Sequence, residues 1–199
     1  MPETRRHILT VALRLFIQHG YREVTLGKLI EAAGVSKGSF YHYWPEKLAL
    51  FREVVEEFFL SYFRGFSYAD TELSVRELMD TTVRDFETMM GELRRMIGED
   101  GTPFGYYLLL LEALRLFPEL QETVAGEYER YTREITHLIR RAQERGEIGQ
   151  RLSARTVAEI LVPQTEGTAL IAFMVRTPDA AATLRRHLEG IYTLLSRSE

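Results

Sequence analysis

The feature that most constrains the fold is a series of closely spaced residues near the start of the sequence that typically begin or end helices. Apolar residues at helical spacing run from Ile8 to Phe16, and Gly20 follows where glycine commonly ends a helix. Thr25 and Ser36 have side chains that cap helix N-termini, and Gly34 between them suits a tight turn. We therefore predict three short helices, with only a short turn between the second and the third.

The rest of the chain keeps the helical spacing and shows no convincing strand. We predict a fourth helix from Pro45, placed in its first turn, to about Phe66, followed by a polar connection over residues 68–74. Further helices are expected over residues 75–97, 103–116, 118–146, 153–175 and 179–196. A break or bend is expected at Pro163, and one is compatible with the pattern at Gly91. The prediction is an all-α fold of about nine helices.

Composition excludes several classes of protein. The chain is 45% hydrophobic and 27% charged, as in globular proteins. It contains no cysteine, which excludes disulfides and thiolate metal sites. No signal peptide is evident, and the uncharged apolar run Phe104–Leu111 is far shorter than the ~20 residues of a bilayer span. We therefore expect a cytoplasmic protein with no membrane partner.

The charge is unevenly distributed along the chain. Residues 1–52 hold eight Arg and Lys against four Asp and Glu, whereas the whole chain has a net charge of −4. A basic first part on an acidic body suits a module that faces phosphate. The excess is small, so it supports nucleic-acid binding without establishing it.

The second and third predicted helices, with the turn between them, match a helix-turn-helix. Reading DNA with this motif needs a second helix whose first outward residues are small or hydrogen-bonding, because they enter the major groove and contact base edges. Phe40 falls on the inward face of that helix. The outward residues predicted to contact bases are Lys37, Gly38, Ser39 and His42.

Other side chains near this motif are suited to phosphate. Tyr41 and Tyr43 can place hydroxyls there, as Lys47 can place its ammonium. Such contacts set the register of a protein on DNA and carry no sequence information. The alternative is a plain helical hairpin in a bundle. A very short helix with two tyrosines and His42 on its exposed side is an unusual way to build a core, which favours DNA binding.

The segment Thr25–Leu48, TLGKLIEAAGVSKGSFYHYWPEKL, resembles the DNA-binding signature of TetR-family repressors. In that signature a capped helix, AAGVS, a small-residue pair, a tyrosine, an aromatic residue and a lysine recur in this order. The resemblance covers roughly residues 4–63, and the rest matches only in helix layout and length. It implies DNA contacts for Thr25, Lys37, Gly38, Ser39, Tyr41, His42, Tyr43 and Lys47.

Two positions depart from the family pattern. Gly27 stands where many members carry a side chain able to reach DNA, so one contact is expected to be missing. Trp44 replaces the more usual phenylalanine, and we expect it to pack the reading helix against the fourth helix. The resemblance also implies a domain organisation. Residues 1–46 would form the DNA-binding domain and residues 47–199 a helical ligand-binding and dimerisation domain, with the fourth helix, 46–66, linking the two.

A homodimer on a palindromic operator is implied by the family, and DNA geometry gives a separate reason. Half-sites on one face of the duplex lie about 34–36 Å or a multiple of this apart, and a two-fold dimer reads both. The last two predicted helices could form a four-helix bundle with their symmetry mates, although their apolar stripes could equally be intramolecular core. The residues expected at the interface are Leu161, Thr165, Ala169, Phe173, Leu184, Leu188, Ile191 and Leu195.

Aromatic residues and methionines concentrate in the middle of the chain. Taken singly, each is more often core than cavity, but the family's habit of binding an inducer here favours a pocket. The expected lining residues are Phe59, Tyr62, Phe63, Phe66, Phe86, Met89, Met90, Phe104, Tyr107, Leu108 and Leu111. We expect an uncharged or amphipathic lipophilic effector and no cofactor or metal. Glu112 could hold a cationic group of the ligand, but a simpler interpretation is an ion pair with Arg115. For Glu166 two interpretations stay open: a contact with the ligand or at the interface, and a solvated position beside the kink at Pro163.

The predicted function is that of a sequence-specific transcriptional regulator, a repressor released from its operator by a small ligand. The fourth helix is expected to act as the lever between pocket and reading helix. An enzyme is not expected, because the five histidines lack metal-ligand spacing and no phosphate loop or nucleophile elbow appears. The alternative is a ligand-binding or adaptor protein with a vestigial DNA-binding head.

Overall fold

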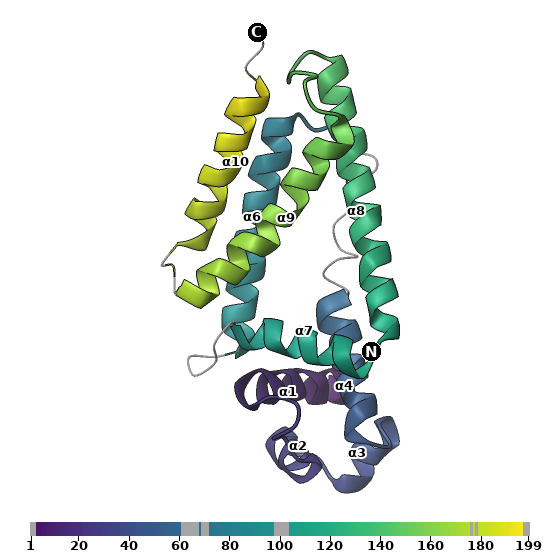
Figure 1. Cartoon of the computed structure of the whole chain (residues 1–199). Helices are drawn as coiled ribbons and strands as arrows, with labels where there is room; N and C mark the ends of the chain where they lie inside the picture. The colour runs from purple at the N-terminus through teal and green to yellow at the C-terminus, as the bar shows by residue number, and fades with distance from the viewer. Residues whose placement is uncertain are drawn as a thin grey trace. The chain divides into compact units, whose positions relative to one another are not determined.

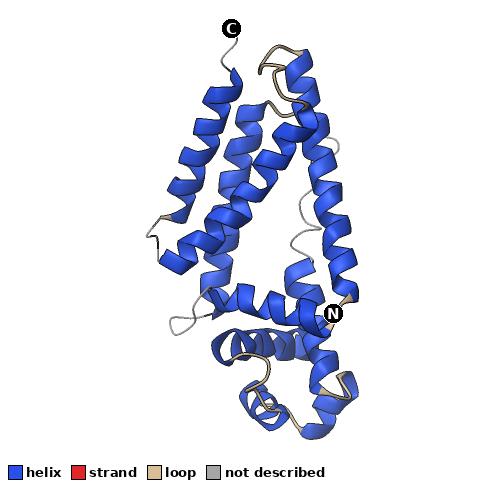
Figure 2. Cartoon of the chain, viewed as in Figure 1, coloured by secondary structure: helices blue, strands red, loops and turns tan. Residues whose placement is uncertain are grey.

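The computed structural model describes residues 3–60, 68, 72–97, 104–175, 177 and 179–196, apart from the side chains of Ile97 and Phe104. Within these ranges every regular element is helical, which confirms the all-α prediction (Figure 2). The chain divides into two compact units. One consists of Met1–Gly65 with Glu92–Val124, and the other of Phe66–Gly91 with Ala125–Glu199.

The first unit begins with four helices around a core of aromatic and aliphatic side chains. They are α1 (Glu3–His19), α2 (Leu26–Ala33), α3 (Lys37–Tyr43) and α4 (Lys47–Val55), which continues into a π-helical segment, η1 (Glu56–Leu60) (Figure 1). Their largest fully buried side chains include Leu13, Phe16, Phe40, Leu50, Phe51 and Phe59. α1 packs against both α2 and α4, so it is the central helix of this group.

Both predicted caps of the helix-turn-helix are confirmed. Oγ1 of Thr25 accepts a hydrogen bond from the N–H of Lys28 at 3.2 Å, and Oγ of Ser36 accepts one from the N–H of Ser39 at 3.0 Å. Gly34 has a φ of 62°, a left-handed conformation that glycine adopts at little cost. The turn between α2 and α3 is therefore closed by the residues predicted for it.

The fourth helix differs from the prediction at its start and in its second half. It begins at Lys47, so Pro45 lies before the helix and not in its first turn. After Val55 the chain is π-helical over Glu56–Leu60. The spacing of apolar residues does not predict this segment, because a single π-helical turn leaves the apolar stripes on either side of it unchanged. The predicted end at Phe66 lies outside the described residues.

α7 (Phe104–Leu116) belongs to the first unit, where it packs against α1 and α4. Gly105 permits this approach, because a Cβ built on it would lie only 2.4 Å from the carbonyl oxygen of Ile17. Farther along, Glu112 of α7 pairs with Arg22 at 3.2 Å. Packing thus groups α7 with the N-terminal helices, and the division after residue 46 stays a functional prediction.

The second unit holds most of α6 (Val75–Ile97) and α8 (Glu119–Glu144), with α9 (Ala154–Val175) and α10 (Ala180–Ser196). α9 and α10 pack against each other (Figure 1). Pro163 lies inside α9 and does not end it, and α6 passes Gly91 without a break. A break at either residue is therefore excluded.

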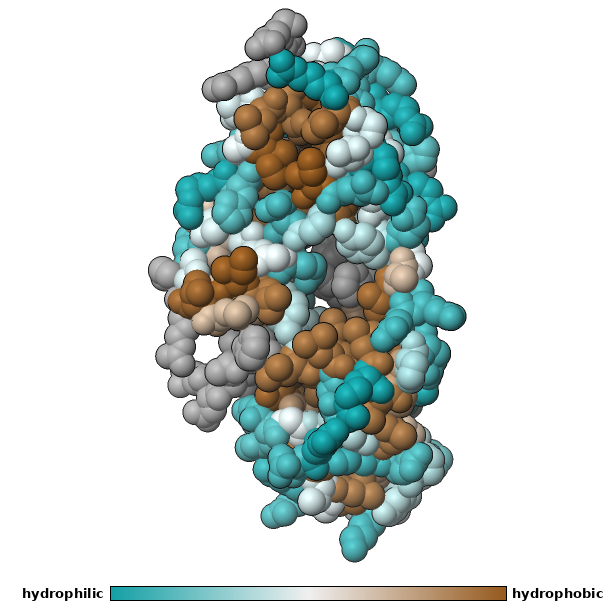
Figure 3. All heavy atoms as spheres, viewed as in Figure 1, coloured by the Kyte–Doolittle hydropathy of each residue, from teal (hydrophilic) through white to brown (hydrophobic). Residues whose placement is uncertain are grey.

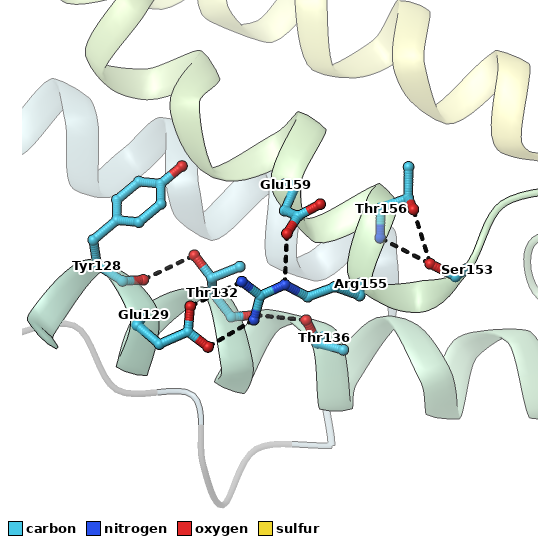
Figure 4. Close-up of polar contacts among 8 residues, drawn as sticks. All are labelled: Tyr128, Glu129, Thr132, Thr136, Ser153, Arg155, Thr156 and Glu159. Carbon is cyan, nitrogen blue, oxygen red and sulfur yellow. Dashed lines mark hydrogen bonds and ion pairs between the residues drawn. The ribbon is translucent and has the colours of Figure 1, made fainter. Parts of the chain in front are cut away.

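Arg155 at the start of α9 ties that helix to α8 (Figure 4). Its guanidinium donates to both carboxylate oxygens of Glu129, each at 2.8 Å, and through Nε to Glu159 at 2.7 Å. Ser153 caps α9, as predicted, by accepting a hydrogen bond from the N–H of Thr156 at 3.1 Å. Because these groups are exposed, the ion pairs contribute little to stability.

Candidate nucleic-acid interface

α3 presents its first residues to solvent and buries its middle. Lys37, Gly38 and His42 are exposed, and Ser39 is half-buried. Phe40 is fully buried on the opposite side and anchors the helix. The arrangement provides small and hydrogen-bonding groups at the N-terminal end of a helix, which is what direct reading of a major groove requires.

The two tyrosines of α3 differ in their surroundings. Tyr41 is 50% exposed, and its ring lies edge-on to Phe40 with centroids 5.9 Å apart. Tyr43 is half-buried, with ring centroids 4.9 Å from His42 and 5.4 Å from Trp44. Tyr41 is therefore the more accessible of the two for a phosphate contact.

The start of α2 is also open to solvent. Thr25 is exposed while its hydroxyl oxygen caps the helix. Gly27 is exposed too, and a Cβ built there would meet only Oγ1 of Thr25 at 4.0 Å. Nothing in the described chain crowds this position, so the missing side chain leaves open surface where the family pattern has a contact.

Lys47 is held by the backbone of the loop between α1 and α2. Its Nζ donates to the carbonyl oxygens of Tyr21 at 2.9 Å and Val24 at 2.8 Å. It also lies 4.3 Å from the centroid of the Tyr21 ring. Burial lowers the pKa of this ammonium, and the nearby Glu23 partly offsets that effect. Lys47 thus stabilises the loop that leads into the helix-turn-helix, a role that sequence spacing did not indicate.

Trp44 packs as predicted and also makes a polar contact. It is 2% exposed, and its ring centroid lies 5.7 Å from that of Phe40. Its Nε1–H donates to Oε2 of Glu53 in α4 at 2.7 Å, and Nη2 of Arg5 in α1 lies 2.7 Å from the same oxygen. Sequence reasoning missed Arg5 and Glu53, and the only signal was the tryptophan in a phenylalanine position.

The residues predicted for the dimer interface lie partly in the core of the second unit. Leu161, Ala169, Leu184 and Leu188 are buried within the chain. Thr165, Phe173, Ile191 and Leu195 are half-buried. The large apolar residues that α9 and α10 leave exposed are different ones, namely Ile160, Leu170, Ile171, Met174, Val175 and Leu194.

The predicted pocket residues fall into three groups. Tyr62, Phe63 and Phe66 lie outside the described residues, as does the side chain of Phe104. In the first unit Phe59 is buried, Tyr107 is half-buried, and Leu108 and Leu111 are exposed on α7, where Figure 3 shows apolar spheres. In the second unit Phe86 and Met90 are buried and Met89 is half-buried. A common cavity stays a prediction.

Glu112 follows the simpler of its two readings. Its carboxylate accepts hydrogen bonds from Arg115 at 2.7 and 3.1 Å and from Arg22 at 3.2 Å. The hydrogen bond from Arg115 is the largest cause of its lowered pKa. Two guanidinium groups already neutralise this carboxylate, so it is not free for a cationic ligand.

In the described ranges, no group of three or more histidine or acidic side chains could hold a metal ion. The helices of those ranges are also too short or too polar to cross a membrane.

Comparison with known proteins decides the family. Residues 8–54 match the family described as bacterial regulatory proteins, tetR family, and residues 107–188 match the tetracyclin repressor-like C-terminal domain. The chain belongs to the TetR family. The resemblance seen in Thr25–Leu48 is thereby confirmed, and the C-terminal match extends from within α7 to within α10.

Two curated relatives illustrate the match. The chain is 50% identical over 54 residues to the transcriptional regulator AcrR of Shigella flexneri, covering 27% of this chain and only 25% of that relative. It is 25% identical over 169 residues to the repressor DhaR of Mycobacterium sp. strain GP1, covering 83% of this chain and 80% of DhaR. The match to AcrR is thus closer but covers about a quarter of this chain, whereas the match to DhaR is weaker and covers most of it.

Solved structures agree in fold over nearly the whole chain. A TetR regulator from Haloarcula marismortui superposes with a TM-score of 0.72 at 14% identity, covering 97% of this chain and 98% of that one. A regulator from Saccharomonospora viridis, solved in complex with choline, gives 0.71 at 23% identity and 96% coverage of both chains. These structures show that the chain has the fold of TetR-family regulators. The family and the curated relatives are transcriptional regulators.

Proposed function

We propose that this TetR-family regulator is a repressor that binds a palindromic operator as a homodimer and leaves it when a small lipophilic ligand binds. The observation that carries the DNA-binding part is the polar, outward N-terminal end of α3, with Phe40 buried behind it. Lys37, Gly38 and Ser39 would contact bases, with His42 beside them, and Thr25, Tyr41 and Tyr43 would contact phosphates. Lys47 would stabilise the helix-turn-helix through its contacts with the loop between α1 and α2.

The proposed dimer uses the faces of α9 and α10 that the chain leaves uncovered. Ile171, Met174 and Val175 are each at least 60% exposed at the end of α9. Figure 3 shows apolar spheres at that end of α9, at the left of the view. Contiguous apolar surface of this kind commonly marks an interface. The predicted residues Phe173, Ile191 and Leu195, half-buried in one chain, lie on the same two helices and would extend the contact.

The proposed effector is an uncharged or amphipathic lipophilic molecule. Phe59 and Tyr106 stack in the first unit, with ring centroids 4.1 Å apart and planes 14° from parallel. A ligand displaces an operator only if it prefers a conformation that misplaces the reading helices. α4 begins at Lys47, next to the helix-turn-helix, and continues into the segment that contains Phe59. We therefore propose that α4 transmits the conformational change from the bound ligand to the reading helix.

Selection of bound sequences from random duplex DNA tests this function, repeated with a series of lipophilic compounds. Enrichment of a palindrome is the expected result, and loss of that enrichment with one class of compound would identify the effector. The competing function is an adaptor with a vestigial head. That protein would enrich no sequence, and its DNA retention would be indifferent to Tyr41→Ala and Ser39→Ala.

A further inference from the structure

One carboxylate oxygen joins the end of α3 to two other helices. Oε2 of Glu53 in α4 accepts the indole N–H of Trp44 at 2.7 Å and pairs with Nη2 of Arg5 in α1 at 2.7 Å. The guanidinium carbon of Arg5 also lies 5.9 Å from the centroid of the Trp44 ring. We call Arg5, Trp44 and Glu53 the α3 tether. Because Trp44 directly follows α3, the tether connects the reading helix to its supports.

α3 needs such support because it has only 7 residues, and helices this short do not hold their shape or direction alone. Its start is fixed by the Ser36 cap, and its middle by the buried Phe40. At its end Trp44 leaves the helical conformation, with φ −134° and ψ 123°. The direction of the last turn therefore depends on what holds Trp44.

The α3 tether fixes the position of Trp44 and adds little to the stability of the folded protein. The Glu53 side chain is 19% exposed, and its other oxygen, Oε1, is buried without a hydrogen-bond partner in the part of the chain that the structure describes. An apolar pair of similar volume commonly stabilises a protein as well as or better than a buried ionic group. What the carboxylate adds is direction, because the indole N–H must point at Oε2.

We propose that the α3 tether determines sequence selectivity without touching DNA. This inference rests on the proposed DNA-binding function. Hydrogen bonds to base edges require the first residues of α3 at a defined angle, whereas exposed side chains reach phosphates from a range of angles. Losing the tether lowers the preference for operator over random DNA and leaves affinity for random DNA nearly unchanged.

The test compares binding of four variants to the selected operator and to a scrambled duplex by fluorescence anisotropy. Trp44→Phe keeps an aromatic ring and removes the donor, and we expect the ratio of the two affinities to fall about tenfold. Glu53→Met removes the acceptor and should act similarly. Glu53→Gln keeps an oxygen acceptor for the indole, so it should largely retain the ratio.

The double variant Trp44→Phe/Glu53→Met separates position from stability. It replaces both partners of the hydrogen bond with apolar groups, and Arg5, whose side chain is 34% exposed, can be hydrated instead. Thermal unfolding should therefore return close to that of the original chain. Its selectivity should stay low, because nothing directs the end of α3. If selectivity recovered together with stability, or if folded Trp44→Phe kept the original ratio, the tether would be only structural. An original chain that preferred no duplex would overturn the DNA-binding proposal itself, before any substitution.

Discussion

Nζ of Lys47 lies 2.9 Å from the carbonyl oxygen of Tyr21 and 4.3 Å from the centroid of the same residue's ring. One side chain of α4 thus holds both the backbone and the aromatic face of the loop that leads into α2. A lysine that recurs in a DNA-binding motif is usually assigned to phosphate. Here its contacts are with the protein, and any phosphate contact would be additional to them.

Lys47→Met should therefore destabilise the protein. It leaves the carbonyls of Tyr21 and Val24 without their donor, which costs about 1–3 kcal/mol of unfolding free energy. Urea unfolding measures the loss. The matched control is Lys37→Met on the exposed surface of α3, which should weaken DNA binding and leave stability nearly unchanged. Equal stability of the two variants would refute the bracing role.

Gly105→Ala should force α1 and α7 apart. The added Cβ would lie 2.4 Å from the carbonyl oxygen of Ile17, and backbone must move to admit it. We expect a loss of about 1–3 kcal/mol, measured by thermal or urea unfolding. Gly126→Ala is the control, since nothing lies within 4 Å of a Cβ there and helix propensity favours alanine. The idea fails if both alanines stabilise the protein.

Ser39→Ala and Tyr41→Phe should weaken DNA binding in different ways. Loss of the Ser39 hydroxyl should cost about 1–3 kcal/mol at one base position and relax the preference there. Loss of the Tyr41 hydroxyl should weaken binding to all duplexes alike, because phosphate contacts carry no sequence information. Affinities for single-base variants of the selected operator distinguish the two, and identical profiles would contradict the assigned roles.

Ile171→Glu should convert the proposed dimer to a monomer. It places a charge in the exposed apolar surface at the end of α9, where desolvating it on association is costly. Sedimentation velocity gives the oligomeric state, and affinity for the full palindrome should fall toward that for a half-site. Leu108→Glu, on the exposed face of α7, is the control and should stay dimeric. A dimeric Ile171→Glu would move the interface elsewhere.

Unfolding at alkaline pH should reveal the buried Tyr68. Burial raises its pKa to about 12, and the carboxylate of Asp85, which accepts its hydroxyl at 3.3 Å, contributes. The unfolded chain ionises this phenol from about pH 10, while the folded chain keeps it protonated. Stability should therefore be unaffected by this group below pH 10 and fall by up to about 1.4 kcal/mol per pH unit between 10 and 12.

Tyr68→Phe is the direct comparison for that slope. The variant cannot ionise at this position, so its stability should fall less steeply over the same pH range in urea titrations. Burial also raises the pKa of the adjacent Tyr131, with Tyr68, Asp85 and Glu134 adding to the effect, so part of the slope should remain. Parallel curves for the two proteins would show that Tyr68 does not titrate as inferred.

Much of the helical layout was predictable because its signals are local. Caps at Thr25, Ser36 and Ser153 act within three residues of themselves, and Gly34 needs only its own φ. The prolines were less predictable. Pro45 fell outside the helix it was expected to start, and Pro163 did not end α9, although proline cannot donate the hydrogen bond of a helix interior.

The unpredicted parts of the site depend on partners distant in the sequence. The sequence shows Gly105 only as a helical glycine and does not show that Ile17 lies against it. It likewise does not show that Lys47 donates to the Tyr21 carbonyl, and the phosphate contact of Lys47 stays a prediction. Spacing identifies which face of a helix is apolar but not which helix covers it. The tryptophan at position 44 was visible as a departure, whereas its acceptor Glu53 was indistinguishable from other surface glutamates.

The close crossing of Gly105 over Ile17 also bears on engineering. A chimera that joins residues 1–46 of this chain to the body of another regulator would bring α1 without the helix that fits against it. In this chain a Cβ at position 105 would clash with the backbone of α1, so a foreign helix with a larger residue at the crossing would have to lie farther from α1. A transplantable reading module of this protein is therefore discontinuous, and α7 must be exchanged together with the head.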